Sequence, residues 1–151
     1  MGAGIVVLIV VVVLAVAGVG WMLASKAADR RLAELRTDVD RPDLERSESA
    51  TCMGVASKGT GKSKGLGVLA LSADQVEFKP VAGEGHVVLE RAAITGAGSV
   101  RTFLGKESSA DLLHLTWTVP TDEVEAGIDE GAWRVADVDW WIGRLAVAPP
   151  S

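Results

Sequence analysis

The stretch GVLALSADQVEF, residues 67–78, has the pattern that decides the fold of this chain. Leu69 and Leu71 recur at every second position, and Val76 and Phe78 do the same after the polar residues that begin at Ser72. Apolar residues with a period of two indicate strands with one buried face, and two such strands joined by a tight turn form a hairpin. The stretch therefore predicts strand, turn, strand.

The same period recurs further along the chain. The alternation LHLTWTV over residues 113–119 is typical of a half-buried strand. Glycine-containing turns over 82–85 and 96–99, and an acidic loop over 120–131, separate the other candidate strands. Those strands cover residues 87–94, 100–104 and 132–135. Together they predict a mainly β body of six to seven short antiparallel strands.

The end of the body has a helical period instead. Its apolar residues are spaced by three and four positions and form one stripe along a helix. The stripe consists of Val138, Trp141, Ile142 and Leu145. Asp137 is placed to cap the start of this helix, and the prolines at 149 and 150 end it. We expect the helix to cap a small barrel, with Trp117, Trp133 and Trp141 in the core.

An uncharged apolar run, IVVLIVVVVLAVAGVGWMLA, occupies residues 5–24. Twenty helical residues span about 30 Å, the thickness of the hydrocarbon layer. Basic residues follow the run and none precedes it, so the positive-inside rule places the N-terminus outside. We therefore expect a single-pass protein of the inner (cytoplasmic) membrane with its body in the cytoplasm. The alternative is a cleaved signal peptide, which would release a secreted or cell-envelope domain.

Composition divides the chain into three parts. Residues 1–25 form the predicted transmembrane anchor, residues 26–50 a charged juxtamembrane linker, and residues 51–148 the β-rich body. The linker mixes acidic and basic residues and has few large apolar ones, so we expect a solvated spacer. Pro42 should end any short helix within it.

The composition also argues against several functions. A net charge of −5 is unfavourable for binding nucleic acid. The single cysteine, Cys52, can form neither an intramolecular disulfide nor a zinc framework. His86 and His114 are isolated in the sequence, and the carboxylates of residues 122–130 lack the spacing of a calcium loop. We expect no cofactor, no metal and no catalytic residues.

Four segments of the body, taken in order, carry a further signal. They are residues 67–78, 87–94, 112–117 and 133–141, with leucines before a phenylalanine, then an isoleucine, and tryptophan in the last helix. In this order the body resembles the pleckstrin-homology-like (PH-like) superfamily, in particular bacterial PH-like and GRAM-type domains. The resemblance implies a small antiparallel β-barrel capped by a C-terminal helix. The glycine-rich stretch 58–67 and the acidic surface depart from the family pattern.

The string ASKGTGKS, residues 56–63, matches a loose phosphate-loop pattern. A phosphate loop must open a helix, whereas this string leads into the alternating strand, so a hairpin loop is the better interpretation. In eukaryotic PH domains the first hairpin often carries phosphoinositide-binding lysines. The resemblance therefore makes Lys58, Lys62 and Lys64 candidate contacts for a lipid head group or another anion, against the simpler interpretation of a solvated loop.

These observations predict a membrane-tethered cytoplasmic PH-like module without enzymatic activity, which binds a protein partner or anionic lipid head groups. Two alternatives stay open at this point. One is a nucleotide-binding protein that uses residues 56–63, and the other is the secreted or cell-envelope domain.

Overall fold

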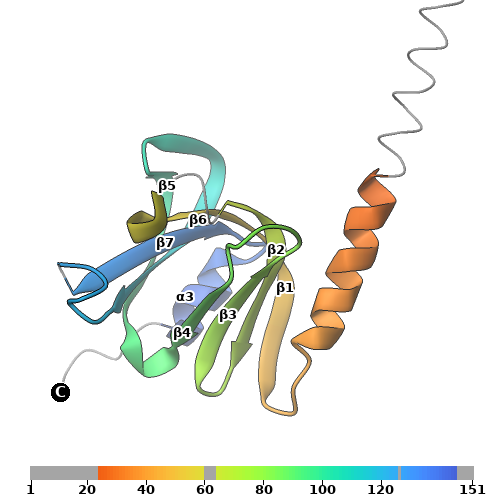
Figure 1. Cartoon of the computed structure of the whole chain (residues 1–151), viewed down its shortest axis with the longest axis horizontal. Helices are drawn as coiled ribbons and strands as arrows, with labels where there is room; N and C mark the ends of the chain where they lie inside the picture. Colours follow the sequence, from red (N-terminus) through yellow and green to blue (C-terminus); the bar gives the residue numbers. More distant parts are fainter. Residues whose placement is uncertain (1–23, 60–63, 126, 146–151) are drawn as a thin grey trace, which may run out of the picture.

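The computed structural model describes residues 24–59, 64–125 and 127–145, and its centre is one seven-stranded antiparallel sheet (Figure 1). The strands are β1 (Leu44–Val55), β2 (Gly65–Ser72), β3 (Gln75–Pro80), β4 (Val87–Glu90), β5 (Ile94–Phe103), β6 (Lys106–Thr118) and β7 (Ile128–Arg134). Their order across the sheet is β4-β3-β2-β1-β7-β6-β5. The described part of the chain also contains two 3₁₀ turns, η1 (Ala56–Lys58) and η2 (Arg91–Ala93), a helix over 24–38 and helix α3 (Val138–Leu145).

The mainly β class and the predicted hairpin are confirmed. Leu69 pairs with Phe78 and Leu71 with Val76, so the apolar residues of β2 and β3 lie on the same face of the sheet. Strand β6 contains the alternating stretch that begins at Leu113, and its last residue is Thr118.

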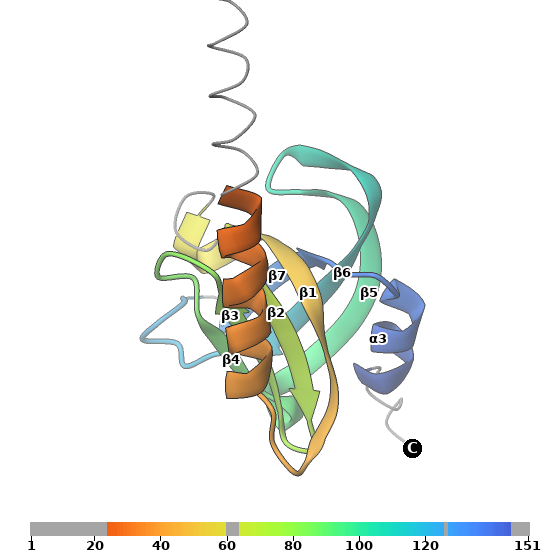
Figure 2. The same ribbon diagram turned by 90° about the vertical axis from the view of Figure 1, so that its right-hand side faces the viewer.

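The sheet is strongly curved but not closed, which corrects the predicted barrel (Figures 1 and 2). Edge strand β4 pairs with β3 and edge strand β5 pairs with β6, and no ladder joins the two edges within the described residues. Strand β4 is only four residues long before η2 turns the chain into β5. From η2 the chain enters β5, which pairs with β6 and not with β4.

The first strand begins earlier than the sequence pattern indicated. Residues 44–50, expected in the linker, form the first half of β1. This strand lies in the middle of the sheet, between β2 and β7. Its first half contains charged and hydroxyl side chains, such as Arg46 and Glu48, and these hide the period of two.

Strand β2 is buried on both faces, and each face is covered by a different helix. Leu69 and Leu71 pack into the main core with Trp141 of α3. Val68 and Ala70, which point the other way, pack under the helix over 24–38. Figure 2 shows that helix lying across β2 and β3, with α3 at a distance from it. The expected solvated spacer is thus partly a helix packed on the sheet.

Helix α3 confirms the prediction made from its apolar stripe. Trp141 is 0% exposed and Leu145 is also buried in the main core. The Asp137 carboxylate accepts a hydrogen bond from the backbone N–H of Trp140 at 3.0 Å, as expected of a helix cap. Trp117 and Trp133 are buried in the same core.

The predicted membrane-spanning helix and the localisation based on it need correction. Across residues 24–59, 64–125 and 127–145, no helix is long and apolar enough to cross a bilayer. The helix over 24–38 alternates small and charged residues and makes its apolar contact through Leu32 and Leu35. The apolar run 5–24, with the predicted anchor 1–25, lies outside the described residues except for its last positions. The predicted single-pass inner-membrane protein with an outer N-terminus is not retained.

Candidate functional site

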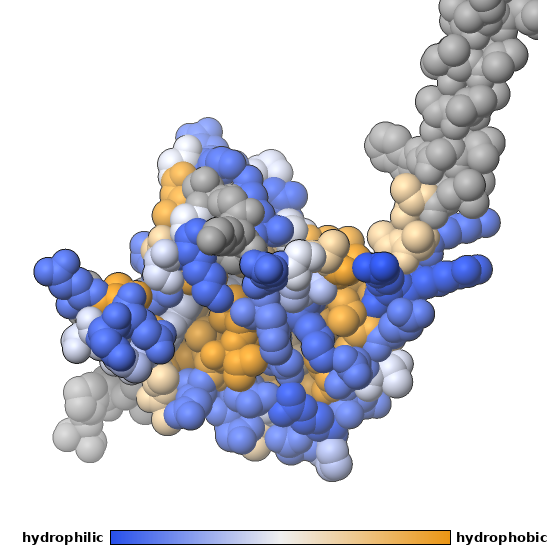
Figure 3. Space-filling view, viewed as in Figure 1, coloured by the Kyte–Doolittle hydropathy of each residue, from blue (hydrophilic) through white to orange (hydrophobic). Residues whose placement is uncertain are grey.

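A large opening lies beside edge strand β4 and has a cavity volume of about 590 Å³. Figure 3 shows apolar side chains at the floor of a hollow in this part of the surface, with hydrophilic side chains around it. We call it the β4 hollow. It is lined by Val55, Ser57, Lys58, His86, Val87, Val88, Leu89, Glu90, Ala93, Trp117, Thr118, Val119, Pro120, Glu123, Val124 and Asp129. Its volume is within the range of about 300–1,000 Å³ that is usual for ligand sites.

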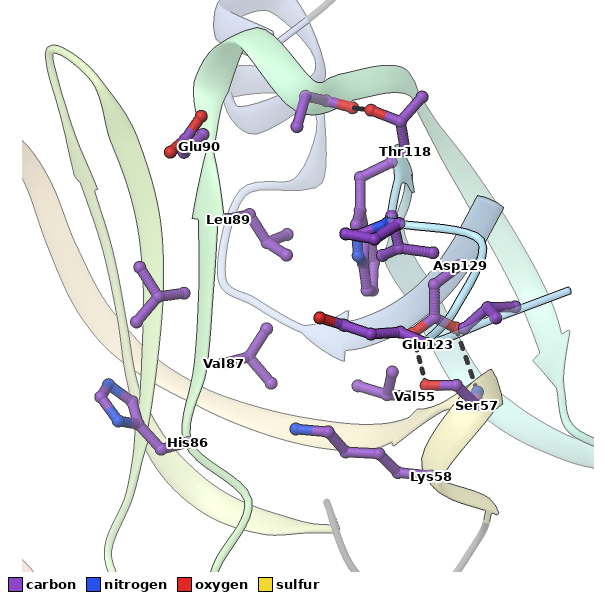
Figure 4. Close-up of a pocket in the computed structure, with 16 residues that line it drawn as sticks. Val55, Ser57, Lys58, His86, Val87, Leu89, Glu90, Thr118, Glu123 and Asp129 are labelled. Carbon is purple, nitrogen blue, oxygen red and sulfur yellow. Dashed lines mark hydrogen bonds between the residues drawn. The ribbon is translucent and has the colours of Figure 1, made fainter. Parts of the chain in front are cut away.

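The floor of the β4 hollow is apolar because of strand geometry. Val87 and Leu89 alternate with exposed residues along β4 and so point together toward the core. Figure 4 shows both side chains directed into the cavity, with Val55 facing them from the end of β1. Trp117, the last inward residue of β6, adds an aromatic ring.

One side of the hollow is fixed by a buried carboxylate. Asp129 on β7 accepts hydrogen bonds from the backbone N–H of Ser57 at 3.0 Å and from the Ser57 hydroxyl at 2.5 Å. It also accepts one from the backbone N–H of Glu130 at 2.9 Å. These bonds hold η1 against β7 and so position Lys58, which directly follows Ser57 (Figure 4).

Two charged side chains extend into the open space of the hollow. Lys58 comes from η1, and Glu123 comes from the loop between β6 and β7 (Figure 4). Neither belongs to any of the ion pairs formed within the described residues. Both charges are therefore available to a ligand.

The structure separates the three lysines of the sequence prediction. Lys58 lines the β4 hollow, whereas Lys62 lies outside the described residues. Lys64 precedes β2 and lies beside Lys106, whose hydrogen bond and positive charge lower the pKa of Lys64. The described lysines thus do not gather around one site, and lipid contact through them stays a prediction.

The other candidates take structural positions. Cys52 is fully buried, and burial raises the pKa of its thiol to about 11. His86 lies 2.9 Å from Glu77, and His114 lies 2.9 Å from Glu130. No group of three or more His, Cys, Asp or Glu side chains that could hold a metal occurs in the described part of the chain.

The phosphate-loop string is described only in part. Residues Ala56–Lys58 form η1, residues 60–63 lie outside the described ranges, and β2 begins at Gly65. The element that follows the string is therefore a strand, as the hairpin interpretation predicted.

Sequence reasoning did not find the β4 hollow, because its parts are distant along the chain. Val55, Leu89 and Glu123 belong to three segments that meet only through the strand order. The one usable signal in the sequence was the alternation of Val87 and Leu89, which marks a short strand with one apolar face.

Comparison with known proteins gives a fold and no family. No protein family model matches the chain, and no curated protein matches its sequence. The structure is similar to a chain in a solved structure described as "The 8S snRNP Assembly Intermediate", with a TM-score of 0.51 and 10% identity. The similarity covers 74% of this chain and 89% of that one. At this identity it shows a shared fold alone.

Proposed function

We propose that this chain is a non-enzymatic binding module of PH-like fold, whose partner is a protein that places apolar side chains in the β4 hollow. The observation that carries the proposal is the hollow itself, an open space of about 590 Å³ with the apolar floor of Val87, Leu89 and Trp117. A concave opening with an apolar floor and a few polar groups around it is the usual form of a binding site.

The chemistry of the hollow favours a protein over an anionic ligand. Its described lining has one lysine, Lys58, against the carboxylates of Glu90, Glu123 and Asp129. Recognition of a phosphate or a lipid head group usually needs several converging cations or backbone N–H groups. A rim with both charge signs around an apolar floor suits a polypeptide segment with mixed side chains.

The PH-like assignment is supported by the element order. Seven antiparallel strands in one curved sheet, followed by a C-terminal helix, agree with the architecture that the sequence resemblance implies.

A matched pair of variants tests the proposal on the full chain. Peptides selected from a random display library by the wild-type protein are measured against Glu123→Trp, which fills the hollow with an aromatic ring, and against Asp122→Trp. Asp122 is an exposed neighbour in the same loop that does not line the hollow.

We expect the selected peptides to lose at least tenfold in affinity for Glu123→Trp and to keep their affinity for Asp122→Trp. Failure to select any peptide, or equal binding to both variants, would contradict the proposal. Binding of anionic vesicles that only Glu123→Trp abolishes would assign the hollow to lipid instead.

A further inference from the structure

Among the residues that the structure describes, edge strand β4 has a strand neighbour on one side only, and its other side borders the β4 hollow. Within the described residues it forms one ladder, with β3, through the pairs from Gln75↔Glu90 to Phe78↔Val87. An edge strand presents a row of free N–H and C=O groups that a further strand can use. Strand β4 contains no lysine and no proline, and Val88 is 51% exposed, so its short length and the charge of Glu90 are the features that limit pairing at this edge.

We propose a specific mode of binding, in which the partner enters as an extended segment antiparallel to β4. Read from its amino end, this segment has an apolar residue, any residue, a second apolar residue, any residue and then an acidic residue. This inference rests on the proposed function and adds the conformation, direction and charge of the partner. Strand addition of this kind supplies affinity from main-chain hydrogen bonds and specificity from alternate side chains.

The alternation of the partner follows from the alternation of β4. Val87 and Leu89 point into the hollow and lie two residues apart. Side chains on one face of an added strand also recur every second residue, so two apolar side chains of the partner lie beside these two. The four residues of β4 span about 13 Å, which is enough for this pair and its flanking backbone.

The direction is inferred from pairing and charge together. Lys58 extends toward the Val87 end of β4, whereas the Glu90 end runs into η2 (Figure 4). Antiparallel pairing is the more stable arrangement and is the one that the whole sheet uses. In an antiparallel pair the carboxyl end of the partner lies beside Val87, so its acidic residue follows the apolar pair and meets Lys58.

The other edge strand, β5, lacks this combination. Its residues from Thr95 to Val100 carry small or medium side chains, and none of them lines the β4 hollow. Backbone pairing at β5 would therefore have no adjacent apolar space to select a partner.

The direct test uses a defined probe and its reverse on the full chain. The probe is the end-capped heptapeptide Thr-Val-Thr-Val-Thr-Glu-Thr, and the control is Thr-Glu-Thr-Val-Thr-Val-Thr, which has the same composition. Titration calorimetry should show about threefold tighter binding of the forward probe, since one rim charge pair contributes a modest energy. Equal affinity, or preference for the reverse peptide, overturns the inferred direction.

Strand pairing is tested separately by N-methylation of the forward probe. In an extended peptide the N–H groups of the two valines point to one edge, and those of the two inner threonines point to the other. Methyl groups on the nitrogens of one set therefore block the edge that faces β4, whereas methyl groups on the other set leave that edge free. We expect at least a tenfold loss for one set and less than a threefold change for the other. Equal losses for both sets would overturn the strand mode.

Two charge variants test the contact with Lys58. Lys58→Gln should weaken the forward probe about threefold, whereas Glu123→Gln removes a repulsive carboxylate and should strengthen it. Lys106→Gln, an exposed lysine that does not line the hollow, should leave the affinity unchanged. An equal effect of Lys58→Gln and Lys106→Gln would contradict the specific contact.

The outcomes separate the two proposals. One outcome is that the selected peptides bind in the hollow although the forward probe does not bind, or although its two N-methylated sets lose affinity equally. That outcome would retain the binding function and reject the strand mode. If neither the selected peptides nor the probe binds, both proposals fail.

Discussion

Two helices within the described ranges, residues 24–38 and α3, cover opposite faces of the same strand, and they are attached in different ways. Helix α3 lies against the concave face, where Trp141 and Leu145 are part of the main core. The helix over 24–38 lies on the other face and touches the sheet through Leu32 and Leu35. We therefore expect α3 to be essential to the fold, and we expect the sheet to tolerate the loss of the helix over 24–38.

The difference extends to the polar contacts. Glu48, a largely buried residue of β1, accepts a hydrogen bond from the indole N–H of Trp141 and another from the backbone N–H of Ala136 at 2.9 Å. Arg46 bonds to the same carboxylate at 3.2 Å and lies 4.4 Å over the Trp140 ring. The other helix relies on exposed pairs such as Lys79 with Asp38, at 2.5 Å. Buried bonds of the first kind are costly to remove, whereas exposed pairs contribute little.

The largest effect should come from Trp141→Ala, which removes a fully buried ring from the core. We expect a loss of about 3–5 kcal/mol in the free energy of unfolding, measured by urea denaturation. Trp140→Ala removes a half-buried ring over which Arg46 lies, and should cost about 1 kcal/mol. Equal losses would remove the distinction between a core face and a surface face of α3.

The next effect concerns the buried carboxylate of β1. Glu48→Ala leaves the indole N–H of Trp141 and the N–H of Ala136 without acceptors, so we expect a loss of about 2–3 kcal/mol. Glu48→Gln keeps one acceptor oxygen and should lose less. Similar losses in the two variants would mean that the hydrogen bonds contribute little to holding α3.

Leu35→Ala should have a smaller and more local effect. Its half-buried side chain lies between its own helix, residues 24–38, and the cluster that contains Val68, so we expect a loss of about 1 kcal/mol, confined to that helix. Hydrogen exchange should show lower protection over 24–38 and unchanged protection in β2 and α3. A cooperative loss of protection throughout the sheet would show that this helix is an integral part of the fold.

The smallest effect should be the pH dependence of the same helix. The hydrogen bond and positive charge of Lys79 lower the pKa of Asp38 from its usual 3.8. The contact therefore contributes fully at pH values above 3.8 and is lost as the pH falls through the lowered pKa. The hydrogen-exchange protection factors over 24–38, corrected for the intrinsic pH dependence of amide exchange, should fall in that window in the wild type. Lys79→Gln should abolish this pH dependence of protection over 24–38. If the pH dependence persists in the variant, it belongs to another titratable group.

The sequence predicted the parts of the fold whose residues alternate or recur with one clear period. The β2–β3 hairpin, β6 and α3 are of this kind, and the cap formed by Asp137 followed from residue type alone. The first half of β1 was missed because Arg46 and Glu48 are charged and do not look like core residues in the sequence. Glu48 is nevertheless buried, and its carboxylate accepts a hydrogen bond from Trp141 of α3. A buried carboxylate is recognised only when its distant donors are known.

The candidate site could not be predicted for a related reason. Its floor and rim are brought together by strand order, and no local pattern encodes the meeting of Val55, Leu89 and Glu123. Lys58 was singled out for a different role, in a lysine cluster that the described residues do not form. The sequence also does not show that β4 is an edge strand, because the position of a strand in the sheet depends on how all the strands pair.

The position of β1 between β2 and β7 has a consequence for how the chain folds. Cys52 pairs with Trp133 across the ladder, and the Glu48–Trp141 hydrogen bond joins residues 93 positions apart. Contacts so distant along the chain make folding slow, because a large loop must close before they form. During synthesis the β2–β3 hairpin can form early, but β1 has a neighbour on one side only until β7 has been made. A nascent chain that stalls before β7 therefore exposes the edge of its central strand, and this is the stage at which we expect it to be most prone to aggregate.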